Sequence, residues 1–218
     1  PIVNLIEIEK DEKISTMISV KDKDETEGYQ LLFATKNGLV KRTPLDDFKH
    51  INKNGKIAIS FRGEDELLGV RLTDGSTEVM LGTREGSLIR FEEEQVRSMG
   101  RTAAGVKGIN LRGDDEVVGV DVLDPGQHVL IVTDKGYGKL THEEEYRSIK
   151  RGGFGGKTAN LTDKNGKLGF IASVDRDEDM MIVTDKGVII RLTIDAISIT
   201  SRNTCLLYTS PSPRDKRQ

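Results

Sequence analysis

Short apolar runs recur along this chain at intervals of about 50 residues, and each leads into a turn of the form Thr-x-x-Gly. A second short segment follows each turn and carries a basic residue. Glycine at this place supplies the positive φ that a tight turn between antiparallel strands requires, so each copy predicts a β-hairpin. The apolar runs are residues 31–34, 79–82, 129–132 and 180–183, and the turns begin at Thr35, Thr83, Thr133 and Thr184.

Two further candidate strands precede each hairpin and are separated by a polar turn. Four short strands in about 50 residues are typical of one blade of a radial β architecture. The sequence therefore predicts an all-β fold with repeats at approximately residues 1–54, 55–105, 106–156 and 157–204. The candidate first strands are residues 3–5, 57–59, 109–111 and 159–161, and the candidate second strands are residues 14–20, 67–72, 117–122 and 168–174.

An acidic segment follows each hairpin and is predicted to form one helical turn. Consecutive glutamates such as those at 92–94 and 143–145 scatter around a helix, so we expect a solvated helix start and not a catalytic pair. The histidines His50, His128 and His142 share no ligand spacing, and we expect them at surface or edge positions. We expect no catalytic residues and no metal site in this chain.

The charge of the chain limits where nucleic acid could bind. Lys and Arg number 33 against 36 Asp and Glu, a formal net charge of −3, so a nucleic-acid site needs positive charge gathered on one surface. The loops between repeats are basic and rich in glycine. Arg101, Arg151 and Arg202 are 50 and 51 residues apart and occupy one position of the repeat. Candidate phosphate contacts are Lys41, Arg42, Arg90, Lys139 and Arg191 in the hairpins and Arg101, Lys107, Arg151, Lys157 and Arg202 in the loops.

The loop at residues 151–158 also partly matches a nucleotide-binding P-loop. It contains Gly156, Lys157 and Thr158, but Arg151 stands where the first glycine of that motif belongs. A P-loop also needs a helix directly after it, and Asn160, Asp163 and Gly166 oppose one. We therefore interpret the loop as a main chain that approaches nucleic-acid phosphates.

The ends and composition of the chain bear on its compartment. No run of about 18 apolar residues is present, and the first residues lack the pattern of a signal peptide. We expect a cytoplasmic protein with no membrane contact. Cys205 is the single cysteine, which excludes an intramolecular disulfide. Residues 205–218 are predicted to be a disordered tail, and they resemble a translated sequencing adapter, so we expect the natural chain to stop near Thr204.

The repeat also resembles a known family. Residues 100–111, 115–119, 133–139, 145–147 and 151–153 are similar to the C-terminal domain of the DNA gyrase A subunit, in the order and at the spacing of that family. The resemblance covers residues 1 to about 204. It implies a β-pinwheel, a propeller-like ring of six blades whose hairpins are exchanged between neighbours. About four four-stranded blades are expected here, in a fragment that lacks the first blade.

The same resemblance implies a function. Duplex DNA is expected to bend around a basic outer rim and to present a segment for ATP-dependent supercoiling. The implied partners are the gyrase B subunit, in an A2B2 complex that uses ATP and Mg²⁺, together with the rest of the gyrase A subunit. No cofactor is implied for this region, and the family's cleavage tyrosine belongs to another domain.

Two departures from the family pattern stand out. Phe154 occupies the place of a lysine in the family's basic glycine box, and no copy of that box precedes the first repeat. The alternatives are the C-terminal domain of the topoisomerase IV A subunit, which shares the blade, and a β-propeller that binds other proteins.

Overall fold

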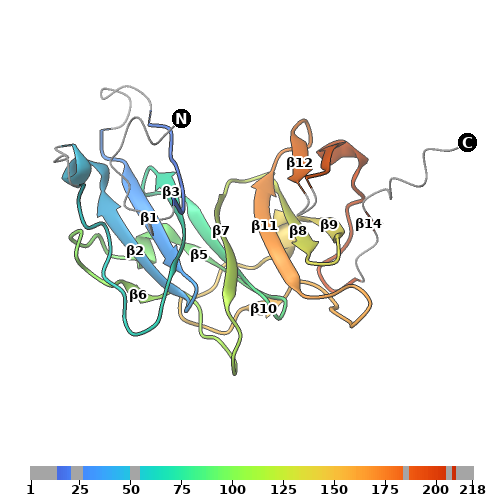
Figure 1. Ribbon diagram of the computed structural model, residues 1–218, viewed down its shortest axis with the longest axis horizontal. Coiled ribbons are helices and arrows are strands. Elements are labelled where there is room, and N and C mark those ends of the chain that lie inside the picture. The colour runs from blue at the N-terminus through green and yellow to red at the C-terminus, as the bar shows by residue number, and fades with distance from the viewer. Residues whose placement is uncertain (1–13, 21–26, 50–54, 184–186, 205–207, 210–218) are drawn as a thin grey trace, which may run out of the picture.

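The computed structural model describes residues 14–20, 27–49, 55–183, 187–204 and 208–209. It contains three four-stranded antiparallel sheets and a two-stranded one, which we call blades one to four (Figure 1). In hydrogen-bonded order, blade one is β3 (Leu67–Thr73), β1 (Gln30–Thr35), β2 (Leu39–Pro44) and β6 (Val106–Lys107). Blade two is β7 (Val117–Leu123), β4 (Glu78–Thr83), β5 (Ser87–Glu92) and β10 (Gly156–Lys157). Blade three is β11 (Leu168–Val174), β8 (His128–Thr133), β9 (Tyr137–His142) and β14 (Tyr208–Thr209), and blade four is β12 (Asp179–Val183) and β13 (Ile189–Thr193). The all-β prediction is confirmed.

The predicted hairpins form the centre of every blade. In the first turn, the main-chain N–H of Gly38 donates to the Thr35 carbonyl at 3.0 Å. The Thr35 hydroxyl accepts the N–H of Leu39 at 3.1 Å, which explains why threonine recurs at this position. Gly38 has φ +80°, as a hairpin with a three-residue loop requires. The second and third turns repeat both bonds.

The helical turns after the hairpins are also confirmed, as single turns of 3-10 helix. They are η3 (Leu45–Phe48), η4 (Glu93–Gln95), η5 (Glu143–Glu145) and η6 (Ile194–Ala196). None of the helices in the described ranges is long and apolar enough to cross a membrane.

The remaining strands are grouped differently from the prediction. Residues 67–72 were expected to join the hairpin that follows them, but β3 pairs with β1 of the hairpin before it. The segments 57–59, 109–111 and 159–161 lie outside strands, as do the described residues 14–20. The fourth strand of blades one and two is instead β6 or β10, which comes from later in the chain. Each of the first three blades is therefore completed on both sides by strands that follow its hairpin in sequence.

One edge strand of each of the first three blades lies beside the corresponding edge strands of its neighbours. The strands β3, β7 and β11 lie next to one another and form the inner edges of the three blades (Figure 1). Asp121 in β7 accepts a hydrogen bond from Arg71 Nε of β3 at 2.7 Å and one from the main-chain N–H of Ser173 in β11 at 3.0 Å. The strands β6, β10 and β14 stand at the opposite ends of the sheets and are the outer edges.

Central strands are buried on both faces, which accounts for their nearly continuous apolar sequence. In β4, Val79 and Leu81 pack with Leu32 of blade one, whereas Met80 packs with Ile131 of blade three. Successive side chains of a strand point to opposite faces, so β4 contributes to two inter-blade cores.

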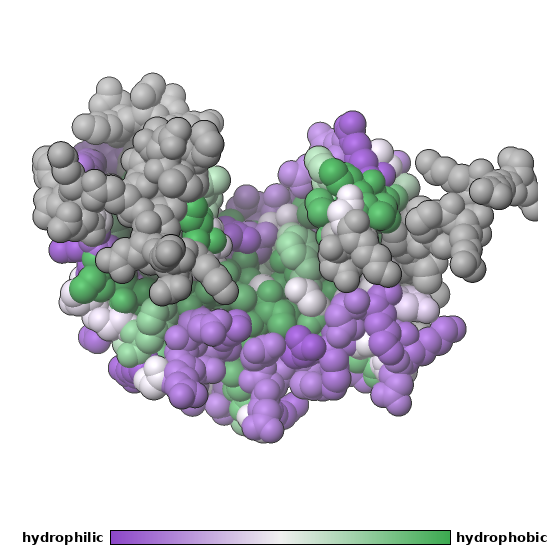
Figure 2. Space-filling model, viewed as in Figure 1, coloured by the Kyte–Doolittle hydropathy of each residue, from purple (hydrophilic) through white to green (hydrophobic). Residues whose placement is uncertain are grey.

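The β12–β13 hairpin of blade four is half-buried on one face and exposed on the other. Met181, Val183 and Ile189 are exposed, in contrast to the equivalent positions of the first three blades. Hydrophobic surface is visible beside this hairpin in Figure 2, while polar residues cover the lower margin of the molecule. Within the described residues, no further sheet packs against this apolar face.

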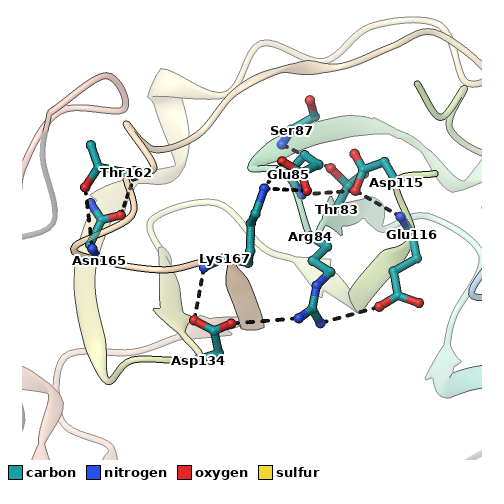
Figure 3. A network of polar contacts seen from close by, with 10 residues as sticks. All are labelled: Thr83, Arg84, Glu85, Ser87, Asp115, Glu116, Asp134, Thr162, Asn165 and Lys167. Carbon is teal, nitrogen blue, oxygen red and sulfur yellow. Dashed lines mark hydrogen bonds and ion pairs between the residues drawn. The ribbon is translucent and has the colours of Figure 1, made fainter. Parts of the chain in front are cut away.

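Polar contacts join blades two and three at their hairpin turns (Figure 3). Arg84 in the β4–β5 turn lies 3.5 Å from a Glu116 oxygen and 3.8 Å from an oxygen of Asp134 in the β8–β9 turn. The Lys167 ammonium donates to Glu85 at 2.7 Å, and the Lys167 N–H donates to Asp134 at 3.0 Å. Each partly exposed pair contributes at most about 1 kcal/mol, so the network chiefly fixes how the blades are aligned.

Two predictions about particular residues need correction. Of the histidines expected at surface or edge positions, His128 is buried, whereas its cross-strand neighbour His142 is exposed. His50 lies outside the described residues. Within the predicted disordered tail, Tyr208–Thr209 form β14, which pairs with Gly138 and Tyr137 of β9. The rest of that tail, residues 205–207 and 210–218, also lies outside the described ranges.

The outer edges are closed by the connecting segments between hairpins. The N–H of Met99 donates to the Arg42 carbonyl at 2.7 Å, and β6 then pairs with Val40 and Leu39. Two glycines make this approach possible. A Cβ on Gly105 would lie 2.5 Å from the Val40 carbonyl oxygen, and one on Gly155 would lie 2.5 Å from that of Leu88. The φ angles of these glycines are +95° and +68°.

Replacing Gly105 or Gly155 by Ala is therefore expected to lower the free energy of unfolding by about 2–4 kcal/mol, through the clash and the positive φ. Chemical denaturation measures the loss. Gly100→Ala is the matched control, because Gly100 begins the same loop as Gly105 and has nothing within 4 Å of an added Cβ. We expect that control to change stability by less than about 0.5 kcal/mol. Equal stability of the Gly105→Ala and Gly100→Ala variants would contradict tight closure of the edge.

His128 predicts how stability depends on pH. Burial, followed by the nearby His142 and Arg176, lowers the pKa of His128 from 6.5, and neither ring nitrogen has a hydrogen-bond partner among the described residues. As the pH falls below 6.5, His128 therefore becomes protonated more readily in the unfolded chain than in the folded one. The free energy of unfolding decreases as the pH falls through this range.

We expect His128→Gln, which introduces the residue found at the equivalent Gln30, to remove part of this loss of stability. Thermal unfolding of the wild type and the variant at pH 5 and pH 7.5 measures the difference. A fall in stability with pH that is the same in the wild type and the His128→Gln variant contradicts the assignment.

Candidate nucleic-acid interface

The basic loops follow from the way the outer edges are closed. Each connecting segment runs along the outer edge of the preceding blade, so its main chain is bound while long side chains can project. The loop of residues 100–108 covers blade one, and the loop of residues 149–157 covers blade two, where the N–H of Ile149 donates to the Arg90 carbonyl at 2.9 Å. The third segment does the same at blade three, since the N–H of Thr200 donates to the Leu140 carbonyl at 2.8 Å.

Successive loops also contact one another. The N–H of Gly152 donates to the Gly108 carbonyl at 2.6 Å, and the N–H of Asn110 donates to the Gly153 carbonyl at 2.7 Å. Arg151 Nη1 donates to the Lys107 carbonyl at 3.0 Å. The first two loops therefore form one continuous surface. We call its cations, together with the equivalent arginine of the third segment, the basic belt: Arg101, Lys107, Arg151, Lys157 and Arg202.

The two lysines of the belt are exposed and occupy equivalent positions. Lys107 Nζ donates to Asn110 Oδ1 at 3.2 Å, and Lys157 Nζ donates to Asn160 Oδ1 at 3.0 Å. An amide carbonyl orients an ammonium without neutralising it. Both charges thus remain available to an anion outside the protein.

The three arginines of the belt are half-buried. Arg151 is the most firmly held, because its Nε donates to the Gln95 carbonyl at 2.7 Å and its N–H to Gln95 Oε1 at 2.9 Å. Arg101 Nη1 donates to the Ile57 carbonyl at 3.3 Å. Within the described part of the chain, the side chains of the five belt residues form no ion pair.

The hairpin arginines, by contrast, have carboxylate partners inside the protein. Arg90 Nε donates to Glu78 at 2.6 Å across the hairpin, and Arg90 also pairs with Glu143 of the next blade. Arg191 Nε donates to Asp179 at 3.0 Å. The carboxylates compensate these two charges, so the structure gives Arg90 and Arg191 a role in joining strands and blades.

The remaining hairpin arginine, Arg42, lies 3.5 Å from Glu93. Glu93 and Glu143 belong to the acidic helical turns and are buried, at 0% and 8% exposure, so the expectation that those turns are solvated is wrong for these two residues. Their burial follows from their position beside Arg42 and Arg90.

Lys41 and Lys139 are buried as well, at 0% and 1% exposure. The Lys41 ammonium donates to the carbonyls of Ala58 and Arg101. Lys139 Nζ donates to the carbonyls of Ser201 at 2.9 Å and Arg202 at 2.7 Å. Both lysines therefore hold the main chain of a belt loop from beneath, and their ammonium groups point inward and not toward solvent.

The buried position of Lys41 also affects its protonation. Burial, and secondarily the Arg101 guanidinium, lower the pKa of Lys41 to about 8. Lys41 is therefore still cationic at neutral pH and able to donate to the loop carbonyls. At the equivalent position blade two has Ile89, which confirms that this site belongs to the interior of the blade.

Sequence reasoning missed several exposed cations. Lys49, Arg97 and Arg147 each stand 14 residues after the hairpin threonine of their copy, and all are exposed. The constant offset was a usable signal. Arg112 is exposed too, and its guanidinium lies 4.7 Å from the centroid of the Phe154 ring. Arg62 occupies the equivalent position 50 residues earlier, so the repeat marks this arginine, but its contact with Phe154 depends on how two loops meet.

Other kinds of chemistry find little support. Gly156–Lys157 of the P-loop-like segment form strand β10, and residues 158–167 contain no helix that could direct a dipole at a phosphate. No group of three His, Cys, Asp or Glu side chains within the described ranges is arranged to hold a metal ion.

Comparison with known families agrees with the blade structure. The family model described as the DNA gyrase C-terminal domain, a beta-propeller, matches residues 29–74, 77–124, 127–175 and 178–204. The first three matches run from the start of a hairpin through the inner strand that completes its blade. They follow the observed grouping of strands.

Relatives of known identity point the same way. The chain is 55% identical over 204 residues to the DNA gyrase A subunit of Staphylococcus epidermidis, while its identity to the Staphylococcus aureus protein of the same name is 54%. The matched residues make up 93% of this chain and 23% of the relative in each comparison, so the chain spans about a quarter of these proteins.

Two solved structures share the fold. The C-terminal domain of DNA topoisomerase IV aligns with a TM-score of 0.86 and 27% identity, covering 95% of this chain and 64% of that one. A DNA gyrase A C-terminal domain aligns with a TM-score of 0.85 and 25% identity, covering 96% and 71%. With the family match over all four blades and more than half of its residues, the chain belongs to the family of DNA gyrase A C-terminal domains.

Proposed function

We propose that this chain binds duplex DNA along the basic belt and bends it around the outer edges of the blades. One observation carries the proposal. In a chain of net charge −3, five cations at repeated positions lie on the outer loops of three blades without an ion-pair partner among the described residues. Eleven acidic residues elsewhere form ion pairs within and between blades.

The belt suits phosphates better than bases. Its lysines are exposed point charges on bound main chain, and phosphate contacts fix position without reading sequence. Each neutralised phosphate releases counterions, so affinity should fall steeply with salt. Bending a short stretch of duplex costs on the order of 1–6 kcal/mol, which contacts along successive blades would offset.

The wider setting of this activity rests on the relatives. As part of a gyrase A subunit, the chain would present bent DNA to an enzyme completed by gyrase B and by the rest of that subunit, in an A2B2 complex using ATP and Mg²⁺. In this proposal the chain contributes no catalytic group. Identity of 54–55% to gyrase A subunits favours gyrase. The solved domains do not separate the two, since the topoisomerase IV domain is 27% identical and the gyrase A domain 25%.

The lysines of the belt provide the test. Replacing both Lys107 and Lys157 by Ala should weaken binding to all duplex sequences alike and reduce the slope of log K against log salt by about two. Fluorescence anisotropy with a labelled duplex at several salt concentrations measures both effects. The variant keeps the main-chain bonds of the loops, because both side chains are exposed.

A matched control removes the same charge elsewhere. Lys36 and Lys135 belong to the hairpin turns, and Lys36 pairs at 2.7 Å with Glu66 just before the inner strand β3. We expect Lys36→Ala with Lys135→Ala to leave the slope nearly unchanged. If both double variants lower it equally, net charge and not the belt governs binding. If the chain did not bind duplex DNA at low salt, the proposal would be wrong and a protein-binding propeller would be favoured.

A further inference from the structure

Phe154 is an aromatic residue in the middle of the basic belt. It lies between Gly153 and Gly155 in the loop that leads to β10, and it is 44% exposed. Three residues to either side stand Arg151 and Lys157. The Arg112 guanidinium approaches its ring to 4.7 Å from the centroid.

The main chain that carries this ring is held on both sides. Gly153 accepts the N–H of Asn110 at 2.7 Å, and Gly155 is packed against the Leu88 carbonyl. Arg151 is bonded to Gln95 and to the Lys107 carbonyl. The ring is therefore presented from a fixed support, and little main-chain entropy would be lost when it engages a ligand.

An aromatic ring contributes nothing to a phosphate contact. The equivalent residue in the preceding loop is Ala104, which shows that the fold of the loop does not require a ring here. Proteins that bend DNA often insert an apolar side chain between base pairs, which unstacks one step and kinks the duplex. A half-exposed Phe framed by cations on the proposed DNA surface has the chemistry of such a wedge.

Arg112 fits the same interpretation. It covers part of the ring through a cation–π contact in the free protein, which lowers the penalty of exposing the ring to water. When the ring enters DNA, the guanidinium is within reach of the neighbouring phosphates. The belt would then bind the DNA backbone while the Phe154 ring inserts between base pairs.

We propose that Phe154 is a wedge that enters bound duplex DNA at a deformable base step and fixes where the DNA kinks. This inference rests on the proposed function. Pyrimidine–purine steps unstack most easily, so Phe154 introduces a preference for TA and CA steps that phosphate contacts alone would not give. Among the described loops of the belt, only the one with Phe154 carries a ring, so one kink is expected per bound domain.

The experiment uses this chain and duplexes in which 2-aminopurine replaces the adenine of a central TA step. Its fluorescence rises when the base is unstacked. We expect wild-type binding to raise the signal and Phe154→Ala to abolish the rise, with about 5-fold or greater loss of preference for a TA-step duplex over a stiff A-tract duplex. Phe154→Leu should keep part of both effects, because leucine also wedges.

Phe170→Ala is the matched control. Phe170 is 48% exposed on the inner strand β11, away from the belt, and its removal should change neither readout. The salt slope of Phe154→Ala should equal that of the wild type. An unchanged fluorescence rise and step preference in Phe154→Ala would overturn the wedge while leaving belt binding intact. No binding by the wild type would overturn the proposed function and the wedge with it.

Discussion

Backbone hydrogen bonding at the sheet edges is the constraint on which the rest of this structure depends. A lone hairpin is marginally stable and leaves two open edges. Here each of the first three hairpins is closed by an inner strand that follows it directly and by an outer strand from later still, as β1 and β2 are by β3 and β6. Blades are thus tied to one another by covalent connection as well as by the apolar cores between them.

The outer closure has a consequence for charge. A segment that must run along the outside of the preceding blade places its side chains on the outer surface at every repeat. Cations in the hairpins are placed differently, because the hairpins form the centres of the blades and pack against neighbouring blades. Arg90 there pairs with Glu78 and Glu143, and Lys41 is turned toward loop carbonyls. The repeats thus contain two kinds of cation: buried ones that stabilise the blades and loops, and exposed ones that the loops present to solvent.

The hairpins could be predicted from sequence because they depend on neighbours only a few residues away. The grouping of strands could not, since periodicity does not say whether residues 67–73 pair with the hairpin before or after them. Among the site residues, the pairing of Arg90 and Arg191 was partly foreseeable from Glu78 and Asp179, each 12 residues earlier. The alternation of Lys41 with Ile89 at one position likewise indicated burial. Arg62 and Arg112 are 50 residues apart in equivalent turns, so the exposed arginine was foreseeable. Its approach to Phe154 was not, because that contact depends on three-dimensional packing.

The position of DNA on the outer belt is tested most directly by lysine reactivity. Acetylation of the chain with and without duplex DNA, read by mass spectrometry, compares every lysine in one sample. The exposed Lys107 and Lys157 should be protected by DNA, while Lys36 and Lys135 at the hairpin turns stay reactive. Protection of Lys36 and Lys135 with continued reactivity of Lys107 and Lys157 would contradict binding at the outer belt.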